Sequence, residues 1–224
     1  MAIKPILFNT EMVRAILDGR KSCTRRLVKP QPDEKHTYPL GFVTDSTEKK
    51  EVGCFGFGIN EYGGSIKYVK SLYQPGDILY VRETWKKALN GYYYYEAWQR
   101  NDIADVTKWK PSIRMPKEAA RIWLKVTNVR VERLQEIDED GVWDEGFRFK
   151  PPCLTRVSAD GHNCDLDGPC TSSIKYCDMT MGELFGRELW NSTIKKSDLY
   201  RYGWDANPWV WVIEFERCEK PEGV

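Results

Sequence analysis

The sequence predicts an α+β fold, a small mixed β-barrel with short helices beside it. Several strand-like segments are separated by turns, and only two or three short helical segments lie between them. A doubly wound sheet would instead need regular alternation of strands and helices. The hydrophobic content of 41% is enough for a core, and no run of about eighteen apolar residues is present to span a membrane.

The first elements are a strand, a helix and a turn. The strand, residues 3–8, contains Pro5, which cannot donate a ladder hydrogen bond and therefore indicates the edge of a sheet. The helix, residues 11–17, has apolar residues at the spacing i, i+3 and i+4, with Thr10 as its expected N-cap. Gly19 suits the left-handed backbone that ends a helix.

The later elements are separated by glycine and proline. Residues 33–70 are mixed, with glycines marking turns between weak strands, and the sequence Pro-Gly-Asp at 75–77 starts the next strand. In the last predicted strand, apolar residues alternate with Glu214 and Glu216, so one of its faces should be buried. The strands predicted in this part are residues 78–85, 92–98, 121–134 and 209–217, and the helices are 136–146 and 181–191.

The aromatic side chains are the unusual part of the composition. Nine Trp and twelve Tyr occur in 224 residues, and they gather at 92–98 and 190–211. Aromatic residues favour strands and bury large areas, so most of them are expected in a β-rich core. The alternative is that some of them stack on a base or another planar ring.

The overall charge and the N-terminus restrict the functional classes. A net charge of +1 gives no argument for nucleic-acid binding by the whole surface, so such a role would need a local basic patch. Residues 1–5 lack the apolar region of a signal peptide, which predicts a cytoplasmic protein. In a reducing compartment Cys23, Cys54 and Cys218 are expected to be free thiols.

A basic segment directly after the first helix is the most specific feature. It reads Gly19-Arg20-Lys21-x-x-Thr24-x-Arg26. A charge run of this kind is most often a solvated turn, because buried cations repel one another unless an acid or an anion compensates them. The chemical alternative is that Lys21, in an apolar site or beside other cations, gives up its proton and acts as a base toward the Thr24 hydroxyl. An acid from a distant segment would then orient the pair.

The segment 16–26 resembles the signature of ASCH domains, a branch of the PUA-like fold. Segments 73–85, 134–147 and 209–217 resemble the blocks that follow it, so the resemblance touches both ends of the chain, and its type is similar to phage and prophage members. Small bacterial members are amidohydrolases that deacetylate N4-acetylcytidine. The resemblance implies one PUA-like domain over residues 1–224. It also implies three catalytic residues: Thr24 as the nucleophile, Lys21 as its base and Glu145 as the acidic partner. Arg20 and Arg26 are placed to supply positive potential at this site and are expected to bind the substrate.

Two other functions stay open at this point. Other ASCH proteins bind RNA and some cut it, so the resemblance also allows a noncatalytic module for RNA or a modified nucleotide, or a nuclease. Insertions at 33–70, 86–118 and 148–180 distinguish this chain from the small amidohydrolases, so the substrate need not be the same. Glu83 competes for the acidic role, and it could equally pair with Arg82 or with the basic segment.

A cysteine-rich insertion at about 150–178 predicts a metal site. This segment is rich in Pro, Gly, Asp and Ser and has too few apolar residues to form its own core, so a structural metal would be needed to hold its conformation. Four thiolates suit tetrahedral zinc in a closed, structural site, with His162 as a possible substitute ligand. An iron–sulfur cluster would use the same ligands, and disulfides are the alternative under oxidising conditions. The four cysteines are Cys153, Cys164, Cys170 and Cys177.

Overall fold

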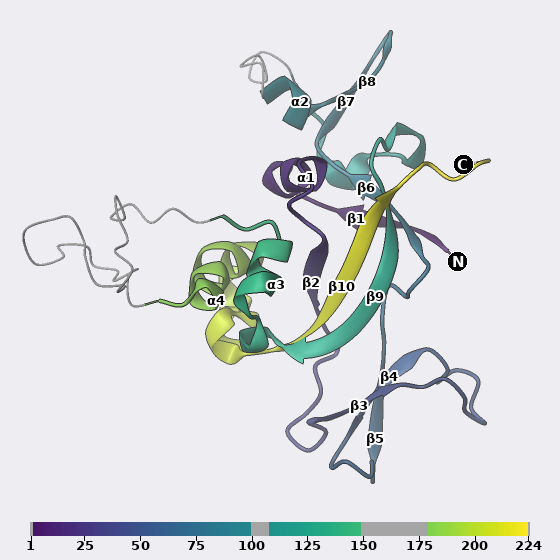
Figure 1. Cartoon of the computed structure of the whole chain (residues 1–224), viewed down its shortest axis with the longest axis vertical. Coiled ribbons are helices and arrows are strands. Elements are labelled where there is room, and N and C mark those ends of the chain that lie inside the picture. The colour runs from purple at the N-terminus through teal and green to yellow at the C-terminus, as the bar shows by residue number, and fades with distance from the viewer. Residues whose placement is uncertain (1, 100–107, 149–178, 224) are drawn as a thin grey trace, which may run out of the picture.

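The computed structural model describes residues 2–99, 108–148 and 179–223 and is a mixed α+β structure in which strands dominate (Figure 1). These residues form a five-stranded, a three-stranded and a two-stranded sheet. The five-stranded sheet runs in the order β1 (Ile3–Leu7), β6 (Ile78–Arg82), β9 (Trp123–Arg133), β10 (Trp209–Cys218) and β2 (Cys23–Leu27).

The long antiparallel pair β9 and β10 forms the centre of this sheet. β6 continues the sheet antiparallel to β9 and pairs in parallel with β1, which contains Pro5 and lies at an edge as predicted. β2 is the other edge, and no described strand pairs it with β1, so backbone hydrogen bonds do not close the predicted barrel within the described residues. A side chain nevertheless joins the two edges, because Arg26 Nη2 in β2 donates to the Leu7 carbonyl of β1 at 3.0 Å.

The helices are short, as predicted, and their ends are capped locally. α1 (Thr10–Leu17) begins one residue earlier than predicted, because the Asn9 side chain accepts from the Met12 amide at 2.8 Å and is the N-cap in place of Thr10. Gly19 follows with φ +72°, the left-handed conformation expected there. The remaining α-helical segments are α2 (Tyr95–Gln99), α3 (Glu139–Asp144), α4 (Met181–Leu184), α5 (Asn191–Thr193) and α6 (Leu199–Tyr202).

Three sequence-based expectations need correction. The strand predicted at 78–85 ends at Arg82, and the chain then enters a separate hairpin of β7 (Trp85–Ala88) and β8 (Gly91–Tyr94). The strand predicted at 92–98 becomes helical at Tyr95, because a run of four tyrosines carries no period that separates strand from helix. Residues 23–27, expected as a polar turn, form β2 instead.

The main core lies between the five-stranded sheet, α1 and a three-stranded sheet made from the 33–70 insertion. Trp209, Trp211, Ile213 and Phe215 of β10 all belong to it, which confirms the predicted buried face. Rings from the insertion pack directly on that face, with Phe55 lying 5.9 Å from Trp211. The inserted sheet consists of β3 (Tyr38–Phe42), β4 (Cys54–Gly58) and β5 (Ile66–Lys70).

A second core cluster covers the opposite side of β10. It is built around Val210, Phe185, Trp190 and Trp204 and holds α3 and the helical segment that begins with α4 against the sheet. Between α4 and α5 this segment contains a π-helical turn, Phe185–Trp190. In the part of the chain that the structure describes, no helix combines the length and apolar character needed to cross a membrane.

Candidate active site

The basic segment is fixed to the end of α3, which lies more than a hundred residues further along the chain. Lys21 forms an isolated antiparallel bridge with Glu145. Next to it, the Ser22 amide donates to the Asp144 carbonyl and the Ser22 hydroxyl donates to the Asp144 carboxylate, both at 2.9 Å. These contacts bring together the two distant segments that contain Lys21, Thr24 and Glu145.

Gly146 allows this close approach. It has φ +76°, and a Cβ at this position would lie 2.7 Å from the Ala15 Cβ and 3.0 Å from the Lys21 Cβ. Any side chain would therefore meet both α1 and Lys21, and it would also require a strained backbone. Glycine at 146 ends α3 and lets Glu145 reach Lys21.

Lys21 and Glu145 form a buried ion pair. Lys21 Nζ donates to Glu145 Oε2 at 2.6 Å and to the Glu145 backbone carbonyl at 2.9 Å, and the two side chains are 0% and 3% exposed. The second carboxylate oxygen, Oε1, accepts from the Arg25 amide at 2.6 Å. A buried pair is tolerated when its remaining polar atoms are also hydrogen-bonded, and both Glu145 oxygens meet that condition.

Arg25 and Cys23 of β2 lie beside this ion pair. The Arg25 guanidinium donates to Glu132 and to the Gly141 carbonyl. Burial alone would lower the pKa of Arg25, but Glu145 and then Glu132 raise it above its ordinary value, so Arg25 stays charged. Burial, and then the charge of Glu145, raise the pKa of the Cys23 thiol to about 12, which favours the protonated thiol at neutral pH.

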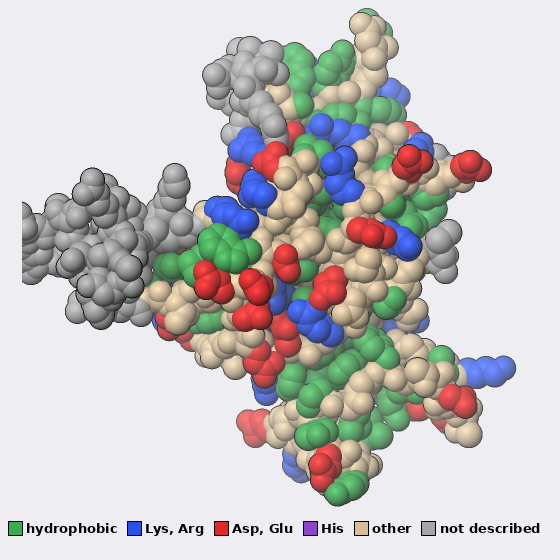
Figure 2. Space-filling view, in the orientation of Figure 1, with side chains coloured by type: hydrophobic (Ala, Val, Ile, Leu, Met, Phe, Trp, Pro, Cys, Tyr) green, Lys and Arg blue, Asp and Glu red, His purple; other side chains and the backbone are tan. Residues whose placement is uncertain are grey.

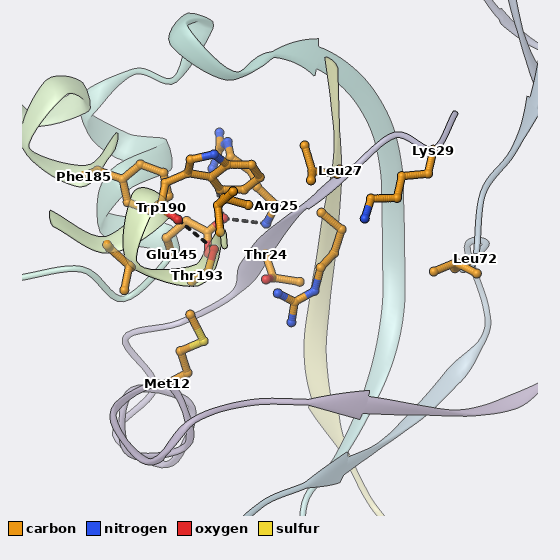
Figure 3. A pocket seen from close by; sticks show the side chains of 13 residues that line it. Met12, Thr24, Arg25, Leu27, Lys29, Leu72, Glu145, Phe185, Trp190 and Thr193 are labelled. Atoms are coloured by element: carbon orange, nitrogen blue, oxygen red, sulfur yellow. Dashed lines mark hydrogen bonds and ion pairs between the residues drawn. The ribbon is translucent and has the colours of Figure 1, made fainter. Parts of the chain in front are cut away.

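Thr24 lines a cavity of about 370 Å³ beside the ion pair (Figure 3). Glu145 forms part of the same wall, and Trp190, from the π-helical turn, closes another side. The Thr24 hydroxyl makes no hydrogen bond to any residue that the structure describes, so it is available to a ligand. Lys21 is absent from the described lining and reaches the cavity through Glu145.

Arg26 is one of three basic residues that line this cavity, together with Arg25 and Lys29. It lies on the same strand face as Thr24, two residues away, and its guanidinium is held by the Leu7 carbonyl and by the Phe8 ring at 5.4 Å. Burial lowers the pKa of Arg26, and the carboxylate of Glu145 opposes that shift. The guanidinium is thus a fixed cation at the cavity wall.

The structure places Arg20 in a neighbouring cavity and not beside Thr24. Its guanidinium binds Asp18 and the Gly146 carbonyl. This second cavity, of about 390 Å³, also contains Arg148 and shares Glu145 with the first one. The expected contribution of Arg20 to the Thr24 site therefore has to act from the other side of Glu145.

Glu83 lies elsewhere. Its carboxylate forms a two-pronged ion pair with Arg121, at 2.9 and 2.8 Å, and neither Arg82 nor the basic segment is its partner. Burial raises the pKa of Glu83, while Arg121 lowers it. Among the described residues that line the two cavities, Glu83 does not appear.

Sequence reasoning missed the helical wall of the Thr24 cavity. Phe185, Leu189 and Trp190 line it, and the π-helical turn that presents them has no signature in the sequence. Arg25 was also missed as the second cation at Glu145. The alternation of side chains in a strand could have predicted this role, because a strand over 23–27 puts Thr24 and Arg26 on one face and Arg25 on the other.

The predicted zinc ligands and the comparisons complete the description of the site. Cys153, Cys164, Cys170 and Cys177, with His162, lie outside the described residues, and within those residues no group of three or more potential metal ligands occurs. The zinc site stays a prediction, which elemental analysis tests at about one zinc per chain. No family model, no curated protein and no solved structure matches the chain.

Proposed function

We propose that the chain is a PUA-like protein of the ASCH superfamily that hydrolyses the amide of an acylated pyrimidine nucleoside or base, such as N4-acetylcytidine. The observation that carries the proposal is the Thr24 hydroxyl, which has no hydrogen-bond partner among the described residues and lies in the wall of a cavity that Thr24 shares with Glu145 of the buried Lys21–Glu145 pair. The proposed barrel is supported by the Arg26 side chain, which joins the two edges of the five-stranded sheet.

The cavity suits a nucleoside in size and in chemistry. Its volume of about 370 Å³ falls within the usual range of small-molecule sites, roughly 300–1,000 Å³. Phe185, Leu189 and Trp190 provide apolar walls for a pyrimidine ring and an acyl group, and Arg26 and Lys29 provide cations. Apolar walls with few polar groups are typical of sites that orient a small ring.

The proposed reaction has two steps that share the same residues. Lys21, after passing its proton to Glu145, accepts the proton of the Thr24 hydroxyl as Oγ1 attacks the amide carbonyl. The carbon–nitrogen bond breaks, the proton goes to the leaving amine, and the acyl group remains as an ester on Thr24. Water then hydrolyses the ester and restores the hydroxyl with release of the carboxylic acid. Arg26 would stabilise the negative oxygen of each tetrahedral intermediate.

This mechanism requires a short movement in the substrate-bound state. Lys21 Nζ now donates both of its described hydrogen bonds to Glu145, so it must come within about 2.6–3.2 Å of Thr24 Oγ1 to act as a base. Catalytic hydrogen bonds are often formed only in the complex with substrate. The 2.6 Å contact between Lys21 and Glu145 supplies the route by which Lys21 loses its proton.

Substitution of Thr24 tests the proposal. Thr24→Val keeps the shape but removes the hydroxyl, so turnover of N4-acetylcytidine should fall by at least about 10²-fold, while Thr24→Ser should keep part of it. Thr193→Val is the matched control, because Thr193 lines the same cavity but its hydroxyl donates to the Trp190 carbonyl at 2.7 Å. Wild-type turnover in Thr24→Val would refute the assignment of the nucleophile.

A noncatalytic binding module is the second candidate. The observation that favours it is the cationic pair Arg26 and Lys29 in the cavity wall, which suits a nucleotide phosphate as well as an oxyanion. Isothermal titration with cytidine monophosphate and with RNA, beside the turnover assay, separates the two functions. Binding without turnover of any acylated nucleoside would select the module, and shortened RNA products would select a nuclease.

A further inference from the structure

Serine, histidine and aspartate side chains meet beside the inserted three-stranded sheet, outside the Thr24 cavity. Asp33 and His36 lie in the segment that leads from β2 to β3, and Ser65 directly precedes β5. None of the three is among the described residues that line the Thr24 cavity. Every residue of the insertion 33–70 is described, and Figure 1 shows its sheet at the opposite end of the molecule from the β7–β8 hairpin.

The three side chains form a hydrogen-bonded chain with the geometry of a Ser–His–Asp triad. His36 Nδ1 lies 2.7 Å from Asp33 Oδ1, and the other ring nitrogen, Nε2, lies 3.1 Å from the Ser65 hydroxyl oxygen. The Asp33 carboxylate favours the tautomer with the proton on Nδ1, so Nε2 accepts from the Ser65 hydroxyl. Both distances fall within about 2.6–3.2 Å, the reach of a general base. A triad is recognised by such geometry and not by the order of its residues in the sequence.

Asp33 is held in place by several donors. Its Oδ1 accepts from the backbone amides of Lys35 and His36, both at 3.1 Å, and Lys67 Nζ lies 3.5 Å from its Oδ2. The hydrogen bond from His36 lowers the pKa of Asp33 to about 2, so this carboxyl group is ionised at neutral pH. An ionised, positioned carboxylate orients the imidazole and stabilises the cation that forms when Nε2 takes a proton.

The turn before Ser65 carries unbonded amides next to the hydroxyl. Gly63 and Gly64 have φ +89° and +60°, left-handed conformations that glycine adopts without strain. The amides of Gly64 and Ser65 donate no hydrogen bond to any residue that the structure describes. Successive amides in a turn can form a small concavity that binds an anion. These two amides can therefore stabilise the negative oxygen of a tetrahedral intermediate on Ser65.

Apolar side chains lie beside this turn. A Cβ at Gly63 would lie 3.2 Å from Ile66 Cδ1. A Cβ at Gly64 would lie 2.7 Å from Ile59 Cγ1, so both isoleucines pack against the turn. Ile59 is 48% and Ile66 38% exposed, and hydrophobic side chains reach the surface over the inserted sheet at the bottom of Figure 2. Ser65 is exposed as well, so a substrate with an apolar group can reach its hydroxyl.

We propose that Ser65, His36 and Asp33 form a second catalytic site, which hydrolyses carboxylic esters with an apolar acyl group. Ser65 Oγ attacks the ester carbonyl while His36 Nε2 takes the hydroxyl proton. The carbon–oxygen bond of the ester breaks, the alcohol leaves with that proton, and the acyl group remains on Ser65. Water, activated by His36, then releases the carboxylic acid and restores the hydroxyl. An ester is expected and not an amide, because an open site gives less electrostatic stabilisation than one that excludes water.

Covalent labelling tests the proposal. Diethyl p-nitrophenyl phosphate transfers its phosphoryl group to an activated serine with loss of p-nitrophenol, and it should label the full chain on Ser65. Trypsin releases this residue in the fragment 51–67, where Ser65 is the single serine and no threonine occurs. His36→Gln should slow the labelling by about 10²-fold or more, the usual contribution of a general base. Asp33→Asn should slow it too, because Asn keeps an oxygen for the turn amides but lacks the negative charge.

Turnover of p-nitrophenyl butyrate gives a second readout. The wild type should release many equivalents of p-nitrophenol per chain, and Ser65→Ala should lose this turnover while circular dichroism shows an unchanged fold. Ser46→Ala is the matched control, because Ser46 lies in the same insertion but its hydroxyl donates to Glu51 at 2.9 Å and not to a histidine. This variant should react as the wild type does.

Four results would overturn the proposal. They are absence of labelling and of ester turnover in the wild type, a label on Tyr62 or Thr24 in place of Ser65, wild-type ester turnover in Ser65→Ala, and an unchanged labelling rate in His36→Gln. The last result would make Ser65 an ordinary exposed hydroxyl. Turnover of N4-acetylcytidine is measured separately, and neither outcome decides the other, because the two proposed sites share no residue.

Discussion

Glu145 and Glu83 are both buried carboxylates held by a cation, and they occupy different environments. Glu145 lies between Lys21 and Arg25 and lines two cavities. Glu83 is held by both prongs of Arg121, which also pairs with Glu96 of α2, and Glu83 lines neither of those cavities. Burial and ion pairing are common to both, so they cannot identify a site by themselves. Access to a cavity separates the two.

The way each carboxylate is held points to different roles. Arg121 joins Glu83 to Glu96 of α2, and Glu96 also pairs with Arg14 of α1, so this cluster connects α2 to α1 and to the end of β6. Around Glu145, Lys21 lies two residues before β2 and the Arg25 amide lies within β2, which also carries Thr24 to the cavity wall. The Glu83 cluster connects secondary-structure elements to one another, and the Glu145 cluster positions the Thr24 hydroxyl beside a cavity.

Removing the cation from each pair should give the largest difference. Lys21→Met should lower turnover of N4-acetylcytidine by about 10²–10⁴-fold, because Thr24 would lose its proposed base. Arg121→Met removes the cation from the other buried pair and should leave turnover within a few-fold of wild type. Initial rates at a temperature where circular dichroism shows both variants folded measure the contrast. Equal losses in the two variants would mean that both clusters act only through folding.

Arg121→Met should instead lower the free energy of unfolding by about 3–5 kcal/mol, since it leaves Glu83 buried without its partner. Burial already raises the pKa of Glu83, so the folded chain holds a proton to higher pH than the unfolded chain, and stability falls as pH rises through that window. Without Arg121 the pKa rises further. Urea unfolding should therefore show a greater loss at pH 8 than at pH 5.

The control for this experiment is Arg130→Met. Arg130 is 43% exposed and pairs with Glu132 and Glu214 at the surface, so its removal should change stability by less than about 1 kcal/mol. A similar loss at both pH values in Arg121→Met would argue that Glu83 is not the group that titrates.

Gly146→Ala should have an intermediate effect, and it acts on the Glu145 cluster alone. The new Cβ would clash with Ala15 and Lys21 and would sit at φ +76°, at a cost of about 1–3 kcal/mol. Turnover should fall as well, because the clash separates Glu145 from Lys21. Gly76→Ala is the control, since Gly76 has φ +86° with nothing within 4 Å of its Cβ position. An equal effect on turnover in both variants would contradict this account.

The sequence predicts the elements of the fold better than their arrangement. The helix at α1, the long strand β9 and the buried face of β10 follow from periodicity, and the structure confirms them. β2 was missed because its polar side chains look like a solvated turn, and their partners Glu145 and Glu132 lie more than a hundred residues away. The local sequence pattern cannot show that these charges are neutralised by carboxylates far away along the chain.

The candidate site shows the same division. Lys21, Thr24 and Glu145 were selected from sequence, and the structure brings them together; their catalytic roles remain a proposal. Most aromatic residues were expected in the core, and in the segment 92–98 Tyr92 and Tyr94 do pack against a core cluster, whereas Tyr93 and Trp98 line a cavity outside the core clusters. The composition shows that aromatic residues gather in this segment, and only the three-dimensional structure shows which of them line a cavity.

Cys23→Ala should have the smallest effect of the four substitutions, although Cys23 lies beside the proposed base. Its thiol is buried, contacts Arg25 Nη1 at 3.7 Å and stays protonated at neutral pH, since burial and then Glu145 raise its pKa to about 12. A small buried thiol contributes mainly packing, so the free energy of unfolding should change by about 1 kcal/mol. Turnover should remain within a few-fold of wild type, and Cys23→Ser should behave alike. A loss of turnover as large as that of Lys21→Met would show that the thiol takes part in the reaction and that Thr24 was wrongly chosen as the nucleophile.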